Sequence, residues 1–309
     1  MSHQAAAGLP ANIVVFERGW LSSNNILFIG AEETALVDTG YATHAEQTLA
    51  LVESTLGTRL LDRILNTHLH SDHCGGNAAL QQRYPSLRTD IPPGEATLVE
   101  RWDEERLSFR ATGQICPRFQ FSGLLQPGKE CILGDRPWQV HSAPGHDPHS
   151  IILFDPVSQT LISADALWEN GFGIAFPELA GEPSFDDVAA TLDRIETLAP
   201  LQVIPGHGRV FDDVGNALAT ARRRLEGLQR DPVKHARHAI KVLMKFKLLE
   251  VQSIALDDWE AWLRGATYLG VIRSRFFADM ELRQLTDDIL VELVYAGAAE
   301  MDASCVRNI

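Results

Sequence analysis

Short apolar runs separated by turn residues open the chain and predict a meander of β-strands. The runs are rich in Val, Ile and Leu and are broken by Gly30-Ala31-Glu32 and by Thr39-Gly40. A helix follows, because apolar residues recur at helical spacing until Gly57, and another buried strand comes after it. The strands are expected at residues 12–16, 25–29, 34–38 and 60–65, and the helix at 44–56.

The same alternation of strands and helices returns after an irregular middle segment. Residues 85–128 contain Pro92-Pro93, a charged helical stretch at 95–106 and an irregular part, which is typical of a lid or a substrate-facing insert. Helices are expected at 77–84, 186–198 and 213–228, and strands at 138–142, 150–154, 160–163 and 202–204. Two successive groups of strands and helices predict an α/β fold, with two stacked sheets and helices outside.

The pattern changes near residue 222, where Arg222-Arg223-Arg224 precedes a helix start at Asp231-Pro232. One face of the expected helix 233–249 is apolar and the other is basic. The apolar face carries Val233, Ala236, Ile240, Leu243, Met244 and Leu248, and the other face carries Lys234, Arg237, His238, Lys241 and Lys245. With further helices at 257–263 and 287–296, the chain divides into a domain at 1–221 and a small helical domain at 222–309.

Composition describes a globular protein of 309 residues, with 45% hydrophobic and 22% charged residues. The net charge of −14 lies almost entirely in residues 1–221, which disfavours nucleic acid and suits divalent cations. Four dispersed cysteines without a CxxC pair favour a reducing compartment. Because the N-terminus does not read as a secretory signal and no stretch is apolar enough for a membrane helix, we expect a cytoplasmic protein without membrane contact.

The densest chemical signal is the segment Thr67-His68-Leu69-His70-Ser71-Asp72-His73, directly after a buried strand. Three imidazoles and a carboxylate within six positions are the ligands that a borderline dication such as Zn²⁺ prefers. A single histidine is usually a structural residue, but four such side chains together rarely are.

Four further polar residues each follow an apolar strand and stand beside Gly or Pro. They are Asp38, His146, Asp165 and His207. Strand ends that face one rim are where layered α/β folds assemble a site. Each of these short motifs is weak alone, but the set in this order is a strong indication of a metal site.

Together these motifs resemble the metallo-β-lactamase fold superfamily over roughly residues 12–212. The resemblance implies a four-layer αβ/βα sandwich with two metal ions at one edge. It places His68, His70 and His146 on the first ion and Asp72, His73 and His207 on the second, with Asp165 bridging both. Asp38 is then expected to orient the ligands. Zinc is the metal that we expect, with iron or manganese as alternatives.

The resemblance implies a hydrolase in which a water held between two metal ions attacks a carbonyl, with Asp72 as the catalytic residue that handles the proton. A bridging aspartate such as Asp165 resembles the glyoxalase II-like, lactonase-like and RNase-like branches more than true β-lactamases. An ester, thioester or lactone is therefore the expected small-molecule substrate. Three alternatives remain: an endoribonuclease, a mononuclear-iron dioxygenase and a non-catalytic binding protein.

The ribonuclease alternative depends on the basic stretch 222–247, which carries nine Lys and Arg against Glu226 and Asp231. A related branch joins the hydrolase domain to a winged-helix-like module and cleaves RNA. We favour a helix face docked on the acidic body, because aromatic residues that could stack on bases are scarce. The C-terminal helices could also mediate a homodimer.

Several neighbours of these motifs carry weaker expectations. His149 could support a ligand, and Cys74 either touches the site or, as we favour, packs beneath it. Trp168, Phe172 and Phe176 follow Asp165 in a glycine-containing loop. They could line a pocket for the acyl group or form the core below the loop.

Overall fold

Two β-sheets packed face to face form the centre of the protein in a computed structural model, which describes residues 8–309. The strands of the first sheet, in spatial order, are β1 (Ile13–Phe16), β2 (Asn25–Ile29), β3 (Thr34–Val37), β4 (Arg63–Leu65), β5 (Arg88–Ile91) and β6 (Gly123–Leu124). Those of the second sheet are β11 (Gln202–Pro205), β10 (Thr160–Ala164), β9 (Ile151–Asp155), β8 (Arg136–Ser142) and β7 (Glu130–Leu133).

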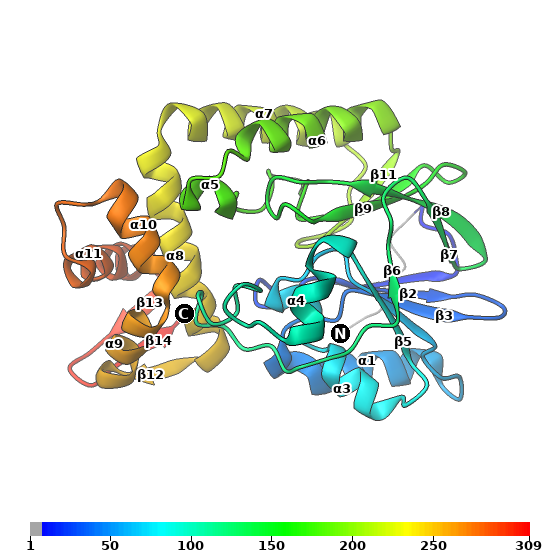
Figure 1. Cartoon of the computed structure of the whole chain (residues 1–309), viewed down its shortest axis with the longest axis horizontal. Helices are drawn as coiled ribbons and strands as arrows, with labels where there is room; N and C mark the ends of the chain where they lie inside the picture. Colours follow the sequence, from blue (N-terminus) through cyan, green and yellow to red (C-terminus); the bar gives the residue numbers. More distant parts are fainter. Residues whose placement is uncertain (1–7) are drawn as a thin grey trace.

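Helices cover the outer face of each sheet, so that four layers follow one another from bottom to top in Figure 1. The first sheet is covered by α1 (Ala45–Leu56) and α3 (Asn77–Arg83), and the second by α6 (Phe185–Leu198) and α7 (Val214–Arg230). Apolar side chains of both sheets, among them Phe28, Leu65, Trp138 and Leu153, form the core between them. The predicted αβ/βα sandwich is confirmed.

Strand direction brings the ends of distant segments to one edge of the sandwich. In the first sheet β3 and β4 run parallel, and in the second β10 and β11 do. The loops that leave these strands therefore emerge on the same side, since carboxyl ends of parallel strands lie together. Asp38, Thr67, Asp165 and His207 all lie just beyond such ends. This edge is where the structure assembles its polar cluster.

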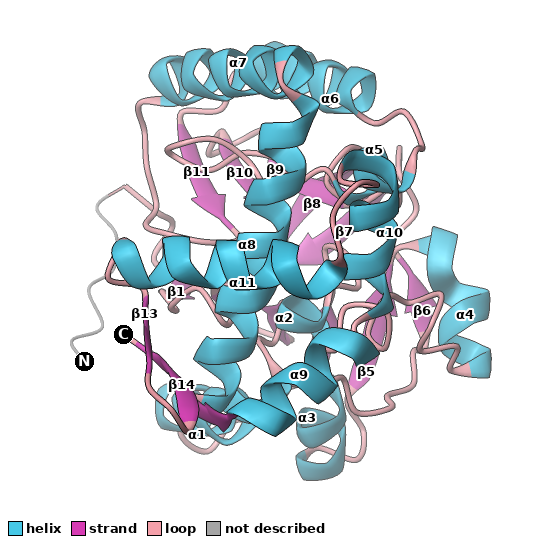
Figure 2. Ribbon diagram, turned by 90° about the vertical axis from the view of Figure 1, so that its left-hand side faces the viewer, coloured by secondary structure: helices cyan, strands magenta, loops and turns pink. Residues whose placement is uncertain are grey.

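The C-terminal part is a smaller layer of helices around one long helix, α8 (Pro232–Val251) (Figure 2). Buried residues of α8 form a core with the remaining C-terminal elements and with α5 (Phe176–Ala180), which belongs to the sandwich. These elements are β12 (Ser253–Ala255), α9 (Leu256–Gly265), α10 (Thr267–Phe276), α11 (Leu282–Tyr295), β13 (Ala299–Met301) and β14 (Cys305–Asn308). The three strands pair as a small antiparallel sheet.

The start of α8 follows its sequence signal, because the Asp231 side chain accepts a hydrogen bond from the Lys234 backbone N–H. Helix α7 passes without a break through residue 222 and packs on α6. Residues 222–230, which were assigned to the C-terminal domain, thus belong to the helical layer over the second sheet. The division into two domains and its winged-helix-like reading stay predictions.

Some expected elements differ from those observed. The helix expected at 95–106 is only α4 (Ala96–Arg101), preceded by the 3-10 turn η2 (Pro93–Glu95), because Trp102 adopts a left-handed conformation at the helix end. Strands β5, β6 and β7 and helix α10 lack a clear periodic pattern and were not predicted. Val233, expected on the apolar face of α8, is 45% exposed because it lies in the first turn, beyond the core. Two short elements complete the described part: η1 (Ala42–His44) and α2 (Ser71–Cys74).

The core around α8 makes a prediction about stability. Ile289 in α11 is fully buried in this core, whereas Val291 in the same helix is 55% exposed. Ile289→Ala should lower the free energy of unfolding by about 2–5 kcal/mol, because it removes buried methyl groups and leaves a cavity. Val291→Ala should change it by no more than about 0.5 kcal/mol. Urea denaturation of both variants checks this, and equal losses would contradict the packing described.

Candidate metal centre

Three histidines form the first group of ligand atoms. His68 and His70 lie in the loop between β4 and α2, and His146 follows β8. The Nδ1 atom of His70 lies 3.1 Å from Nε2 of His68 and 2.8 Å from Nε2 of His146. These nitrogens therefore converge on one point, although His146 is 76 residues beyond His70 in the chain.

Two aspartates and two histidines form the second group, with ligand atoms that all lie within 4.8 Å of one another. The Nε2 atom of His207 lies 3.1 Å from Oδ2 of Asp72, and Nε2 of His73 lies 3.4 Å from Oδ1 of Asp165. The other oxygen of Asp165, Oδ2, lies 3.4 Å from Nε2 of His146 in the first group. Asp165 therefore turns one carboxylate oxygen toward each group.

The donor atoms fit two metal ions. Ligands about 2.1 Å from a tetrahedral ion stand roughly 3.4 Å apart, and the separations above, from 2.8 to 3.4 Å, lie at or somewhat below that value. The Nε2 atom of His73 is buried and has no hydrogen-bond partner among the described residues, which is the state of a nitrogen whose lone pair serves a metal. The cluster therefore satisfies both the geometry and the chemistry that the resemblance implies.

Hydrogen bonds behind the ligands fix their orientation. Asp38 Oδ2 lies 2.7 Å from Nδ1 of His73, and the same carboxylate accepts hydrogen bonds from the backbone N–H and the hydroxyl of Thr67. Asp38 has a left-handed backbone with φ of 56°, a conformation that a short polar residue tolerates. His146 donates its Nδ1–H to the Ile174 carbonyl at 2.6 Å. Each contact selects the ring nitrogen that faces the centre.

Two tryptophans contact the second ligand group. The indole of Trp20 stacks on His207 with ring centroids 5.5 Å apart, and Trp168 donates its Nε1–H to Asp165 Oδ1 at 3.2 Å. Trp168 was expected near the site as a pocket residue. Trp20 has no motif around it and was not predicted; it lies near His207 because the loop before β2 is held there by a hydrogen bond from the Asn24 N–H to the Gly206 carbonyl.

Burial and the neighbouring charges polarise the cluster. Burial lowers the pKa of His68, His70 and His146, in the last case to about 4, so these imidazoles stay neutral. Burial alone would also lower the pKa of His73, but three carboxylates, with Asp165 foremost, raise it well above its usual range. Burial would raise the pKa of Asp165, yet the surrounding histidines hold it well below its usual range. Near neutral pH the cluster therefore combines three neutral imidazoles and a protonated His73 with anionic carboxylates, and a dication that binds to His73 must displace its proton.

Other residues singled out in the sequence lie outside the cluster. The exposed ring of His149 packs against Gly94, and only its backbone N–H acts near the site, by donating to Asp147. It is Asp147, missed in the sequence, whose Oδ2 lies 3.9 Å from Nε2 of His70. Cys74 is buried, with its Sγ 3.7 Å from that of Cys116.

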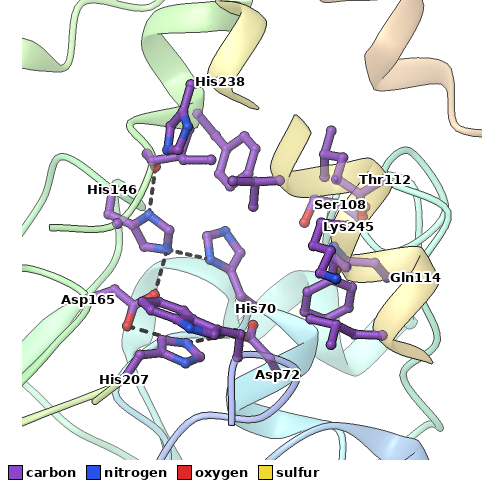
Figure 3. Close-up of a pocket in the computed structure, with 18 of the residues that line it drawn as sticks. His70, Asp72, Ser108, Thr112, Gln114, His146, Asp165, His207, His238 and Lys245 are labelled. Atoms are coloured by element: carbon purple, nitrogen blue, oxygen red, sulfur yellow. Dashed lines mark hydrogen bonds and ion pairs between the residues drawn. The ribbon is translucent and has the colours of Figure 1, made fainter. Parts of the chain in front are cut away.

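The ligands open into a cavity of about 420 Å³, which Figure 3 shows in close-up. Ligands His70, Asp72, His146, Asp165 and His207 lie on one side, and residues of α8 form the opposite wall. Trp168 and Phe176 line the cavity, whereas Phe172 is buried in the core below their loop. Two of the three aromatic residues, Trp168 and Phe176, therefore lie at the cavity, and the third, Phe172, belongs to the core.

The irregular segment after α4 forms a further wall of the cavity. Ser108, Thr112 and Gln114 of this segment line it, and Ser71 Oγ donates to Gln114 Oε1 at 2.5 Å. The C-terminal part holds the same segment, because Trp262 Nε1 donates to the Gly113 carbonyl at 3.1 Å. The insert therefore connects the ligand-bearing helix α2 to α9.

Comparison with known proteins assigns the family. A family model described as the metallo-beta-lactamase superfamily matches residues 18–207. The chain belongs to this superfamily. A curated relative from Synechococcus sp. (strain JA-3-3Ab), named hydroxyacylglutathione hydrolase, is 30% identical over 58% of this chain and 60% of its own. One of the same name from Nostoc sp. (strain PCC 7120) is 27% identical over 61% and 63%. The chain thus spans about three fifths of the length of these relatives.

Solved structures agree with this assignment. The protein TTHA1623, solved in a di-iron-bound form, is 28% identical, with a TM-score of 0.54 over 67% of this chain and 98% of that one. The metallo-beta-lactamase family protein TTHA1429 from Thermus thermophilus is 20% identical, with a TM-score of 0.54 over 97% of this chain and 99% of that one. The second likeness shows that the overall fold extends through the C-terminal part. The curated relatives are thus hydrolases by name, and this chain contains a histidine–aspartate cluster with the donor atoms of a metal site.

A glycine against the bridging residue gives a test of the centre. A Cβ at Gly206 would overlap Oδ1 of Asp165 and press on the ring of His73. Gly206→Ala should therefore displace the bridge and reduce the bound metal from about two ions per chain to one or fewer. Gly215→Ala in α7, where a Cβ meets no atom within 4 Å, is the matched control and should keep its metal. Elemental analysis decides, and full occupancy in Gly206→Ala would contradict the geometry.

Metal uptake by chelator-treated protein should release protons near neutral pH. His73, whose pKa is raised well above its usual range, is protonated there and must lose its proton to bind a metal. The release should shrink as the pH rises through that elevated pKa, since the nitrogen is then already neutral. Asp38→Asn removes one of the carboxylates that raise the pKa, so it should release fewer protons. Zn²⁺ titration calorimetry in two buffers of different ionisation enthalpy measures the number, and equal release by both proteins would refute the assignment.

Proposed function

We propose that this protein is a two-metal hydrolase that cleaves an ester, thioester or lactone carbonyl. The observation that carries the proposal is the position of Asp165, with one oxygen toward each ligand group. A carboxylate placed in this way would hold one cation through each of its oxygens. A purely structural metal site needs only one closed set of ligands and no open cavity beside it.

Two divalent ions at this site supply Lewis-acid polarisation of a carbonyl and lower the pKa of a water toward about 7. The protein contributes the positions of the charges. Asp72 lines the cavity and has its Oδ2 beside His207, so its carboxylate can accept the proton that the attacking water loses. The Trp168 N–H holds Asp165 in place from the cavity side.

A carbonyl substrate agrees with the cavity and with the relatives. The cavity walls other than the ligands are mostly apolar, with Ile174, Phe176, Leu243 and Phe246 among them. Hydroxyacylglutathione, the substrate in the relatives' name, is a thioester. We therefore place thioesters first, followed by lactones and simple esters. Zinc is the proposed metal, and the di-iron form of TTHA1623 keeps iron as the principal alternative.

The basic stretch 222–247 gives little support to the ribonuclease alternative, because several of its charges have carboxylate partners within the fold. Arg222 pairs with Asp193 and Glu196. Arg237 and Lys241 both pair with Glu292 of α11. With Lys247 paired to Glu250, four of the nine Lys and Arg have carboxylate partners, which lowers the charge that the strip can offer to phosphates.

Side chains with different roles separate the mechanism from its alternatives. His70→Ala and Asp72→Asn should each lower kcat by about 10²-fold or more, because each removes a metal ligand at the reacting centre. Asp187→Asn, at an exposed position in the first turn of α6, should leave kcat unchanged. Steady-state kinetics on thioesters, lactones, esters, β-lactams and RNA measure this. Full turnover in both ligand variants, or cleavage of RNA alone, would overturn the proposal.

A further inference from the structure

An arginine lines the same cavity as the metal ligands. Arg224 of α7 lies beside His238 of α8, with its Nη2 3.2 Å from His238 Nε2. His238 also lines the cavity and lies on the His146 side of it in Figure 3. The side chain of Arg224 therefore borders the space that a substrate would occupy.

Arg224 differs from its basic neighbours in what it contacts. Its guanidinium lies over the ring of Phe172, 5.4 Å from the centroid, and no carboxylate within residues 8–309 pairs with it. Arg222, Arg237, Lys241 and Lys247 of the same stretch each have an acidic partner. These four residues therefore have counter-ions, whereas Arg224, which lines the cavity, has none among the described residues.

The surroundings make this arrangement costly in the absence of an anion. Burial lowers the pKa of Arg224, the direction expected for a cation withdrawn from water. Burial and the charge of Arg224 lower the pKa of His238 to about 4, so this ring is neutral and accepts the arginine's hydrogen bond. A desolvated cation is usually retained where an anion binds it.

We propose that Arg224 binds a carboxylate of the substrate, so that the enzyme acts on an acyl compound with an apolar chain and a free carboxylate. This inference rests on the proposed function for the scissile carbonyl, and it adds a residue that determines specificity. The guanidinium offers two parallel N–H donors to a carboxylate. Apolar side chains of α8, among them Leu243, Phe246 and Leu249, line the part of the cavity that the acyl chain of such a substrate would occupy.

A carboxylate fits this site better than a phosphate. The stem of Lys245 also lines the cavity, but its ammonium donates to the Ala298 and Ile309 carbonyls and to Asn308 Oδ1. The ammonium of Lys245 therefore already has its hydrogen-bond partners at the C-terminus. Among the described residues that line the cavity, the guanidinium of Arg224 is left as the one cation for the ligand, and its single positive charge matches a single negative charge. Phosphate dianions usually need more than one cation.

Binding of dicarboxylates to the zinc-loaded protein tests the inference without turnover. Linear dicarboxylates of about four to ten carbons are compared with monocarboxylates of the same length, since such chains suit a cavity of this size. The metal ions can bind one carboxylate group of the monocarboxylate or of the dicarboxylate. Only the dicarboxylate has a second carboxylate group that can bind Arg224. The wild type should bind its preferred dicarboxylate about 10-fold or more tightly than the matched monocarboxylate, as measured by calorimetry.

Variants assign this preference to the arginine. Arg224→Met should abolish the preference for the dicarboxylate. Arg224→Lys keeps the positive charge but lacks the two parallel N–H donors of the guanidinium, so it should retain only part of the preference. Arg222→Met, two residues away and paired on the surface, should keep it in full. A wild type without preference, or an undiminished preference in Arg224→Met, overturns the inference.

Kinetics on matched thioesters complete the test. Arg224→Met should raise KM about 10-fold or more for an acyl thioester with a terminal carboxylate and leave KM and kcat unchanged for the uncharged analogue. An equal loss on both substrates overturns the inference and indicates a structural role. A dicarboxylate preference without hydrolysis of any acyl compound supports carboxylate binding and rejects the proposed function. Hydrolysis without the preference rejects only the role of Arg224.

Discussion

The carboxylate of Asp165 is the interaction on which the site depends. It lies between two groups of imidazoles and offers one oxygen to each. Its own place depends on the sheet, because Asp165 follows β10 directly, after Ala164 in a left-handed conformation, and β10 runs parallel to β11. Gly206, at the end of β11, leaves room for it where a side chain would not fit. The site thus depends on the parallel direction of β10 and β11 and on the close contact between the backbone of Gly206 and the carboxylate of Asp165.

Separate parts of the fold serve chemistry and recognition. The candidate ligands belong to loops of the sandwich and to the short helix α2, at the edge of the two-sheet core. The opposite wall of the cavity comes from α8, and the insert is held between α2 and α9. Changes in these outer walls can alter the substrate without disturbing the metal ligands, which agrees with a superfamily in which one centre serves many substrates.

Charge is distributed in the same way. The sandwich places the carboxylates of Asp38, Asp72 and Asp165 beside the histidines of the candidate metal centre. Four of the nine basic residues in the stretch 222–247 pair with acidic residues of the fold, and Glu292 alone takes two of them. Arg224 has no such partner among the described residues and lines the cavity. A single position can therefore acquire a binding role inside a stretch whose other charges stabilise the fold.

The sequence by itself determined the α/β class, the strand ends of the sandwich and the list of candidate ligand residues, which the structure brings together. Strand periodicity and dense local motifs such as His68 to His73 are local signals, and they need no knowledge of distant contacts. Only the tertiary structure decided that Trp20 stacks on His207, that Asp147 rather than the side chain of His149 approaches His70, and that Phe172 lies below the cavity. It also separated Arg224 from the basic residues beside it. Those facts depend on packing between segments far apart in the chain, where neither period nor motif carries information about which side chains meet.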